Sequence, residues 1–216
     1  MQKGFAKVCG GIALLAALTS GVWAEESGGF FGVDVARGLA NQTIELKTKD
    51  GDVTGSYKNL GLKGPRLGFI SGYKHFFTPK FGIRGYGSFN YGAFMGGDKR
   101  SDEDVYMGAL SIGANVDVMY NFCDCDGRIF GAYAGVNLGY IDYHVQDVGS
   151  VEGIDMGLTF GFRAVFNERH SFEIYRRFAR GVEFPVEFVD KDGKASYQRQ
   201  KIVQPDTTGI RYVYNF

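Results

Sequence analysis

The chain has 216 residues, with 24 basic and 24 acidic side chains, 33 glycines, only 4 prolines and 15% aromatic residues. This balanced charge gives no electrostatic basis for binding nucleic acid, so that class of function is excluded. Abundant glycine and aromatic residues with little proline favour twisted antiparallel strands over helices.

The N-terminus carries the three regions of a secretory signal peptide. Lys3 and Lys7 form a positive start, an apolar stretch runs from Val8 to Leu18, and Val22-Trp23-Ala24 precedes two acids. This order predicts cleavage after Ala24, and the apolar stretch is too short to span a membrane as a helix. Residues 1–24 are therefore expected to be removed, which leaves residues 25–216 as one domain with 22 basic and 24 acidic groups.

Eight segments of the mature chain alternate between apolar or aromatic residues and small, polar or charged ones. Period-two alternation places one set of residues on each face of a strand. The segments are Phe30–Leu39, Arg66–Lys74, Phe81–Tyr91, Tyr106–Phe122, Ile129–Tyr143, Ile154–Phe166, Ser171–Phe184 and Thr207–Phe216. In the seventh segment Arg176-Arg177 breaks the alternation, so the pattern does not define its upper part.

The faces of these strands indicate which solvent each one meets. A soluble sandwich or lipocalin-like barrel also alternates, but its outer face is polar. Here Tyr, Phe, Leu and Ile occupy one face throughout, as suits lipid outside and a polar lumen inside. The sequence predicts an all-β fold, an eight-stranded antiparallel transmembrane β-barrel of up-and-down topology.

The predicted connections alternate in length, which orients the barrel because short turns are periplasmic and long loops extracellular. The short links are His75–Lys80, Cys123–Arg128 and Asn167–His170; the long ones are Ala40–Pro65, Met95–Asp104, His144–Gly153 and Ala179–Asp206. Both chain ends are then periplasmic, as an even number of strands requires.

The last strand is the strongest single indication of location. Tyr212, Tyr214 and Phe216 share its apolar face. It resembles the closing strand of bacterial outer-membrane barrels, whose terminal aromatic residue is read by the assembly machinery. The resemblance implies a multi-pass outer-membrane protein. Its expected partners are the barrel-assembly machinery during biogenesis and then outer-membrane lipid and lipopolysaccharide.

Charged residues of both signs are predicted to face the lumen. They are Asp34, Arg66, Arg84, Asp117, Asp155, Arg163, Glu173 and Arg211. One interpretation is an ion-pair and hydrogen-bond network that fills the barrel, because unpaired charges in a low dielectric are costly. The other is a narrow channel for small solutes, lined by the four arginines. An eight-stranded barrel is only wide enough for its own side chains, so the filled lumen is favoured.

No constellation in the sequence predicts an enzyme. An outer-leaflet lipid-modifying enzyme similar to barrel lipid deacylases is the remaining alternative. It would require His144 with Ser150 and a carboxylate from Asp147 or Glu152. All four lie in one loop, and nothing in the sequence fixes the geometry of nucleophile and base.

Two cysteines remain after Cys9 leaves with the signal peptide. Cys123-Asp124-Cys125-Asp126-Gly127 is predicted to form a turn, with Asp126-Gly127 supplying the bend. Oxidising conditions allow the two thiols to pair, and a metal site would need two further ligands that are not nearby in sequence. An inert or self-paired turn is therefore favoured over a redox or metal function. We expect no cofactor.

Several stretches resemble the barrel module of the Helicobacter outer-membrane protein family, in the expected order. They are Gly28–Val33, Leu67–Phe77, Phe81–Gly92, Gly113–Phe122, His170–Glu173 and Tyr212–Phe216. The resemblance implies an outer-membrane barrel and no catalytic residues. The family includes adhesins and porins, but its adhesins carry a large inserted extracellular domain that this chain lacks.

The sequence thus predicts a monomeric outer-membrane barrel with a structural or surface-interaction, adhesion-like role. Its four outer loops would meet a host or other surface ligand. The narrow porin-like channel is the alternative, and the lipid-modifying enzyme ranks below both.

Overall fold

The computed structural model describes residues 25–47, 53–97, 104–125, 127–145, 149–180, 182–189 and 195–216. The predicted signal peptide, with cleavage at Ala24, lies outside these residues. The strands are β1 (Gly28–Lys47), β2 (Val53–Phe76), β3 (Phe81–Gly97), β4 (Asp104–Cys125), β5 (Arg128–Val145), β6 (Gly149–Phe166), β7 (His170–Ala179), β8 (Val182–Val189) and β9 (Ala195–Asn215). No helix among the described residues is long and apolar enough to cross a membrane.

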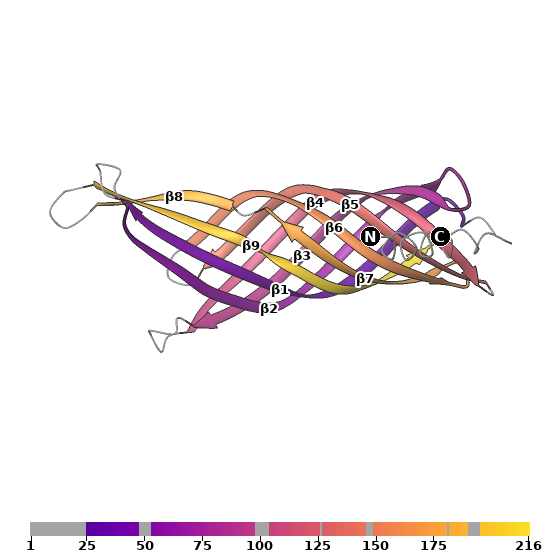
Figure 1. The fold of residues 1–216 in the computed structure, drawn as a ribbon, viewed down its shortest axis with the longest axis horizontal. Helices are drawn as coiled ribbons and strands as arrows, with labels where there is room; N and C mark the ends of the chain where they lie inside the picture. Colours follow the sequence, from indigo (N-terminus) through magenta and orange to yellow (C-terminus); the bar gives the residue numbers. More distant parts are fainter. Residues whose placement is uncertain are drawn as a thin grey trace, which may run out of the picture.

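The sheet closes on itself. Each strand pairs antiparallel with its neighbour, and β1 also pairs with β9, from Phe30 opposite Asn215 to Lys47 opposite Tyr197. β7 pairs with β9 up to Arg177, and β8 pairs with the part of β9 beyond it, so β7 and β8 are successive parts of one wall. The closed antiparallel barrel therefore has eight strands, as predicted (Figure 1).

The two faces of the wall differ in chemistry as the alternation predicted. Large apolar side chains on the outer face are exposed, among them Phe69 (61%), Phe162 (62%) and Ile210 (63%). Charged residues of the opposite parity are buried inside, including Asp117 (1%) and Glu173 (2%). Closure satisfies every strand edge within the barrel wall, which is what allows a sheet to cross lipid.

The seventh strand differs from the sequence prediction. β7 keeps its alternation through Arg176-Arg177, with Arg176 on the outer face and Arg177 buried in the lumen. The predicted break was therefore wrong. Two adjacent arginines look like an interruption in sequence, but they are separated by the wall of the barrel.

Four strands run far beyond the barrel, where the sequence predicted long loops. β1 and β2 stay paired to Lys47 opposite Val53, and β8 pairs with β9 from Val182 opposite Ile202 to Val189 opposite Ala195. The predicted loops Ala40–Pro65 and Ala179–Asp206 are mostly strand. We call this four-stranded extension the outer sheet: Val53–Leu62 of β2, Asn41–Lys47 of β1, Ala195–Val203 of β9 and β8, in that spatial order.

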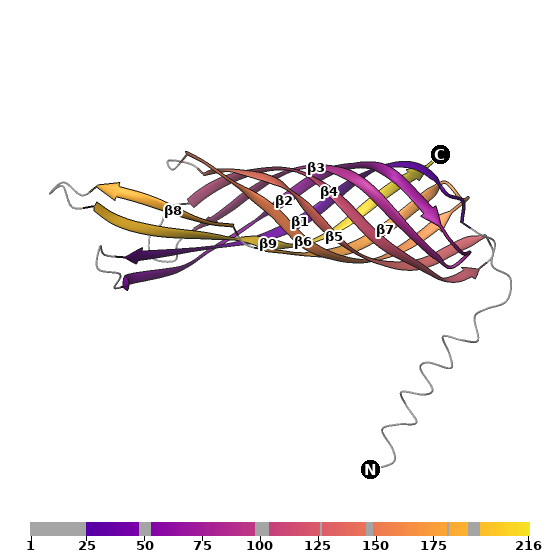
Figure 2. The ribbon, with the colours of Figure 1, turned by 90° about the horizontal axis from the view of Figure 1, so that it is seen from above.

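The outer sheet projects at the end of the barrel opposite the C-terminus, as Figures 1 and 2 show. The other end carries short turns, which include residues 77–80, Gly127 and residues 167–169. Gly127 (φ 73°) supplies the bend expected there, and Asn167 (φ 49°) and Glu168 (φ 61°) adopt the left-handed conformation that a tight hairpin needs. Because short turns are periplasmic in such barrels, we assign this end to the periplasm.

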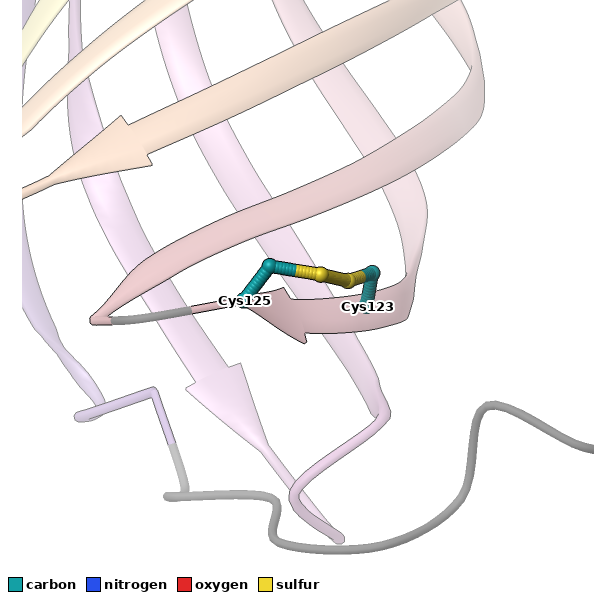
Figure 3. The surroundings of a disulfide bond; sticks show 2 residues. All are labelled: Cys123 and Cys125. Atoms are coloured by element: carbon teal, nitrogen blue, oxygen red, sulfur yellow. A yellow bond between two sulfur atoms is a disulfide. The ribbon is translucent and has the colours of Figure 1, made fainter.

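Cys123 and Cys125 form a disulfide at the end of β4, beside the turn to β5 (Figure 3). The self-paired turn that the spacing allowed is therefore what the structure contains. A register shift between Asn121 and Cys123 in the pairing of β4 with β5 accompanies it. The disulfide belongs to the periplasmic rim, next to the turn between β4 and β5.

The start of β1 and the C-terminus meet where the barrel closes. The Phe216 amide donates to the Gly29 carbonyl at 3.0 Å, and the Phe216 ring lies 5.9 Å from that of Phe31 and 5.6 Å from that of Tyr214. Phe216 is nevertheless 72% exposed. A side chain so exposed contributes little to packing, which leaves it accessible for recognition during assembly.

We predict that Phe216→Ala lowers the yield of folded protein in outer membranes severalfold, because the terminal aromatic is the proposed assembly signal. The yield is measured from the band that changes gel mobility on heating. Phe172→Ala is the matched control, since Phe172 is also lipid-facing and 57% exposed. Equal yields of the two variants would refute a special role for the terminal residue.

Candidate functional site: the lumen and the outer rim

The middle of the lumen is crossed by a buried arginine. The Arg84 guanidinium on β3 donates to Asp117 Oδ2 on β4 at 2.8 Å, and to Glu173 Oε1 and Oε2 on β7 at 2.6 and 3.0 Å. Arg84 and Asp117 are register partners on neighbouring strands, whereas Glu173 lies across the barrel. One cation thus joins two opposite walls through a bidentate contact, the strong geometry for arginine and carboxylate.

Arg211 on β9 extends this central layer. Its Nη1 lies 3.5 Å from Glu173 Oε2 and its Nε 3.7 Å from Asp34 Oδ2 on β1. The Tyr175 hydroxyl donates to Asp34 Oδ1 at 2.8 Å, and the Arg211 guanidinium lies 4.8 Å from the centre of the Tyr175 ring. Two carboxylates and an aromatic ring therefore surround this arginine, although its Nε and Nη1 make no hydrogen bond.

A second layer lies toward the outer end. Arg177 on β7 pairs with Asp155 on β6, and its Nε donates to Asn137 Oδ1 on β5 at 3.0 Å. Arg66 Nη2 on β2 donates to Ser111 Oγ on β4 at 3.3 Å. This layer thus adds a buried ion pair and a polar contact above the central one.

A third layer closes the periplasmic end. Glu25 Oε1 accepts from Lys74 Nζ at 2.6 Å and from Arg163, and Asn121 Nδ2 donates to Glu25 Oε2 at 3.2 Å. Burial alone would raise the pKa of Glu25, but the positive charges of Arg163 and Lys74 outweigh it and hold that pKa below its ordinary value. The carboxylate is therefore ionised and locks two cations.

Glu25 is also the residue that predicted cleavage after Ala24 would make the first of the mature chain. It precedes β1, yet it is 5% exposed. Glu25, which lies ahead of the first strand, is thus folded back into the periplasmic mouth. We call Glu25, Lys74, Arg163 and Asn121 the periplasmic latch.

All eight charged residues singled out in the sequence lie inside the barrel, but they do not form one site. Asp34, Arg84, Asp117, Glu173 and Arg211 make the central layer, whereas Asp155 and Arg163 pair with residues the sequence did not nominate. Those partners are Arg177 and Glu25. Arg177 follows Glu173 and Tyr175 at two-residue spacing, so the period-two pattern could have identified it as a lumen-facing residue. No periodic signal could have found Glu25, because it lies outside the strands.

Large side chains and the charge layers fill the lumen. Lumen-facing glycines make room for them: a Cβ on Gly72 would collide with Tyr86, and one on Gly161 with Tyr133. The cavity between the central layer and the latch, bordered by Arg84 and Glu173, measures about 10 Å³. That is room for about one water molecule.

The outer rim brings together the His-Ser pair of the enzyme alternative. His144 on β5 and Ser150 on β6 are register partners, with His144 Nδ1 2.9 Å from Ser150 Oγ, and both are exposed. Of the two candidate carboxylates, Glu152 stands opposite Asp142 rather than His144, and Asp147 lies outside the described residues. The histidine and the serine are therefore within hydrogen-bond distance, but the described residues include no candidate carboxylate opposite His144 to orient it.

The part of the chain that the structure describes contains no group of three His, Cys, Asp or Glu side chains arranged to hold a metal ion. Cofactor-free function remains the prediction.

The model of the Helicobacter outer membrane protein family matches residues 68–216. The chain belongs to this family. It is a bacterial outer-membrane protein of the barrel type, as the closing strand and the lipid-facing surface predicted. None of the curated proteins matches the chain.

Solved structures share the fold at low sequence identity. OprG from Pseudomonas aeruginosa is 13% identical, with a TM-score of 0.56, covering 89% of this chain and 98% of that one. Neisserial surface protein A is 18% identical, covering 89% and 100%, with a TM-score of 0.46. The attachment invasion locus protein Ail of Yersinia pestis is 12% identical, covering 84% and 97%, with a TM-score of 0.28. At identities this low, the similarity shows a shared fold and nothing about function.

We predict that Arg84→Ala lowers the free energy of unfolding by about 3–5 kcal/mol, because it leaves Asp117 and Glu173 buried without their shared cation. Urea titration in lipid vesicles, followed by the gel mobility of unheated samples, measures this change. Arg169→Ala, in the exposed turn after β6, is the control and should change stability little. Equal losses in the two variants would show that the central layer carries no special energy.

We predict that Glu25→Gln destabilises the barrel at neutral pH by removing the carboxylate that pairs with both Lys74 and Arg163. Since the folded-state pKa of Glu25 is lowered, its stabilisation is present above its unfolded pKa and is lost as pH falls through the folded value. Wild-type protein should therefore lose more stability between pH 7 and pH 3 than Glu25→Gln does. Glu26→Gln is the control, because Glu26 is exposed. Parallel pH profiles for wild type and Glu25→Gln would contradict the latch.

Proposed function

We propose that this protein is a surface-interaction barrel, in which a closed barrel anchors the outer sheet as the part that contacts a partner outside the cell. The observation that carries the proposal is the contrast between the two regions. The described lumen layers are filled by ion pairs and aromatic rings, whereas four strands continue beyond the barrel wall. A protein that only sealed its own lumen would not need this extension.

The backbone of the outer sheet is suited to contact with another chain. β2 pairs with β3 only up to Lys63 opposite Met95, and β8 pairs with β9. Among the described residues, no strand of the sheet pairs with the outer edge of β8 or of Val53–Leu62. Free strand edges present unpaired amides and carbonyls that a partner strand or loop can engage. β8 contains Pro185. Within sheets, proline is found mainly in edge strands, where it limits indiscriminate pairing with other strands.

The alternatives are weaker. A steady channel needs a path through the central layer and the latch, and the cavity between them is about 10 Å³. An outer-leaflet lipid enzyme needs a carboxylate to orient His144, and of the two candidates only Glu152 is described, opposite Asp142. We therefore propose no catalytic role. We expect a single copy of the chain to make this interaction, because both free strand edges belong to the same chain.

We predict that a non-adherent Gram-negative strain displaying the protein binds cultured epithelial monolayers severalfold above an empty-vector strain. Trimming the outer sheet should return adherence to background. The trimmed variant joins Leu39 to Lys63 and Ala179 to Asp206 by short Gly-Asn turns, since Leu39 and Lys63 are paired at the barrel rim. Adhering bacteria are counted after washing.

The control shortens the β3–β4 hairpin between the paired residues Met95 and Tyr106. It should adhere like wild type, and all variants must keep the heat-dependent gel mobility of a folded barrel. Adherence unchanged by trimming the outer sheet would refute the proposal. Steady single-channel openings of the wild-type protein that change ion preference in Arg84→Ala would instead support the channel.

A further inference from the structure

A charged patch interrupts the lipid-facing wall on β7, β9 and β1. Arg176 is on the outer face of β7, between the exposed apolar residues Ile174 (58%) and Phe178 (41%), and it stands opposite Phe160 on β6. The side chain of Arg176 is 56% exposed. An arginine on the lipid face of a barrel is destabilising unless it reaches an interface or finds a partner.

The neighbours of Arg176 make this patch net positive. Arg176 Nη2 pairs with Asp206 Oδ2 at 2.9 Å, and its guanidinium lies 4.8 Å from the centre of the Phe178 ring. Thr208 on β9 stands opposite Arg176 on one side and opposite Arg37 on the other, and Arg37 is exposed. Two arginines and one aspartate thus share three adjacent strands of the outer surface.

The patch lies toward the outer end of the apolar band. The lipid-facing residues from Phe216 back to Ile210 are aromatic or aliphatic, and on β9 Thr208 and Asp206 follow them. On β1, the apolar residues Phe31, Val33 and Val35 come before Arg37, and Leu39 is the next residue of that face. With the periplasm at the end of the short turns, the patch faces the outer leaflet.

An apolar groove adjoins the patch. It measures about 660 Å³ on the outer wall, with the small residues Ala132 and Ala134 of β5 beside Phe160, Phe162 and Phe178, and it extends to Arg176 and Thr208. Two alanines next to three phenylalanines leave a furrow in a surface otherwise covered by large side chains. Its lining is complementary to a hydrocarbon chain, and the guanidinium beside it is complementary to a phosphate.

We propose that this surface is a binding site for the phosphorylated lipid A moiety of lipopolysaccharide. An acyl chain lies in the groove, and a phosphate is bound by Arg176 with help from Arg37. Three features together specify this ligand: net positive charge, an adjoining apolar furrow, and placement at the leaflet that lipopolysaccharide occupies. The site is independent of the outer sheet, so it stands or falls apart from the interaction role.

The experiment measures binding of purified diphosphorylated lipid A to the folded protein in detergent micelles by native mass spectrometry. The comparison ligands are the same lipid A after enzymatic removal of its phosphates, and phosphatidylglycerol. We expect Arg176→Gln to weaken binding of diphosphorylated lipid A about tenfold, the loss typical of one charge-assisted contact. Removing the phosphates should cause a similar loss in wild type and little further loss in Arg176→Gln.

Two further variants locate the site. Arg128→Gln, at an exposed arginine where β5 begins near the periplasmic rim, should bind like wild type. Ala134→Phe fills the furrow and should weaken binding of lipid A with or without phosphates. All variants must first show the gel mobility of a folded barrel.

Three results would overturn the proposal. The first is equal binding of lipid A by wild type and Arg176→Gln, or an equal loss in Arg128→Gln. The second is a preference for phosphatidylglycerol over diphosphorylated lipid A, which would make the site one for phospholipid. The third is no lipid binding together with a protein that co-purifies with wild type but not with Arg176→Gln, which would make the surface a lateral protein contact.

Discussion

Neutralising the charges inside a narrow barrel is the constraint on which the rest of this structure depends. Arg84 meets two carboxylates, one on the adjacent strand and one across the lumen, and Arg211 shares the second of these. A buried pair adds little over a well-packed apolar core, but an unpartnered buried charge is very costly. The network therefore selects the register of the wall, because a slip of one residue would turn these charges toward lipid.

The same constraint explains how the barrel is sealed at its base. Lys74 and Arg163 face the periplasmic mouth, and no strand supplies the anion nearest to them. Glu25, which lies before the first strand, folds back to supply it. Glu25, the predicted first residue of the mature chain, thus completes the polar interior by joining the third charge layer.

In the proposed functions, the outer surface contacts other molecules. The wall carries an apolar band and, on β7, β9 and β1, a positively charged patch. The outer sheet extends beyond the wall (Figure 2). The band suits lipid, the patch suits phosphate, and the sheet edges suit another chain. These are separate surfaces with separate physical requirements, so one barrel can meet the membrane and an outside partner without using its lumen.

The sequence by itself determined the barrel, its strand number, its polar and apolar faces and its membrane. Period-two alternation is a local signal, and lipid imposes it on every spanning strand from Phe31 to Phe216. It also named the residues of the central layer, because inward parity at Arg84, Asp117 and Glu173 follows from the same count.

Only the tertiary structure decided which charges meet. Glu173 reaches Arg84 across the lumen, Arg177 belongs inside although Arg176 beside it faces lipid, and Glu25 enters the barrel without belonging to a strand. The outer sheet was likewise hidden, because strands beyond the membrane lose the lipid-facing apolar residues that made the spanning segments recognisable. Closure of the wall brings together residues far apart in sequence, and that proximity is a property of the barrel's circumference rather than of any local pattern.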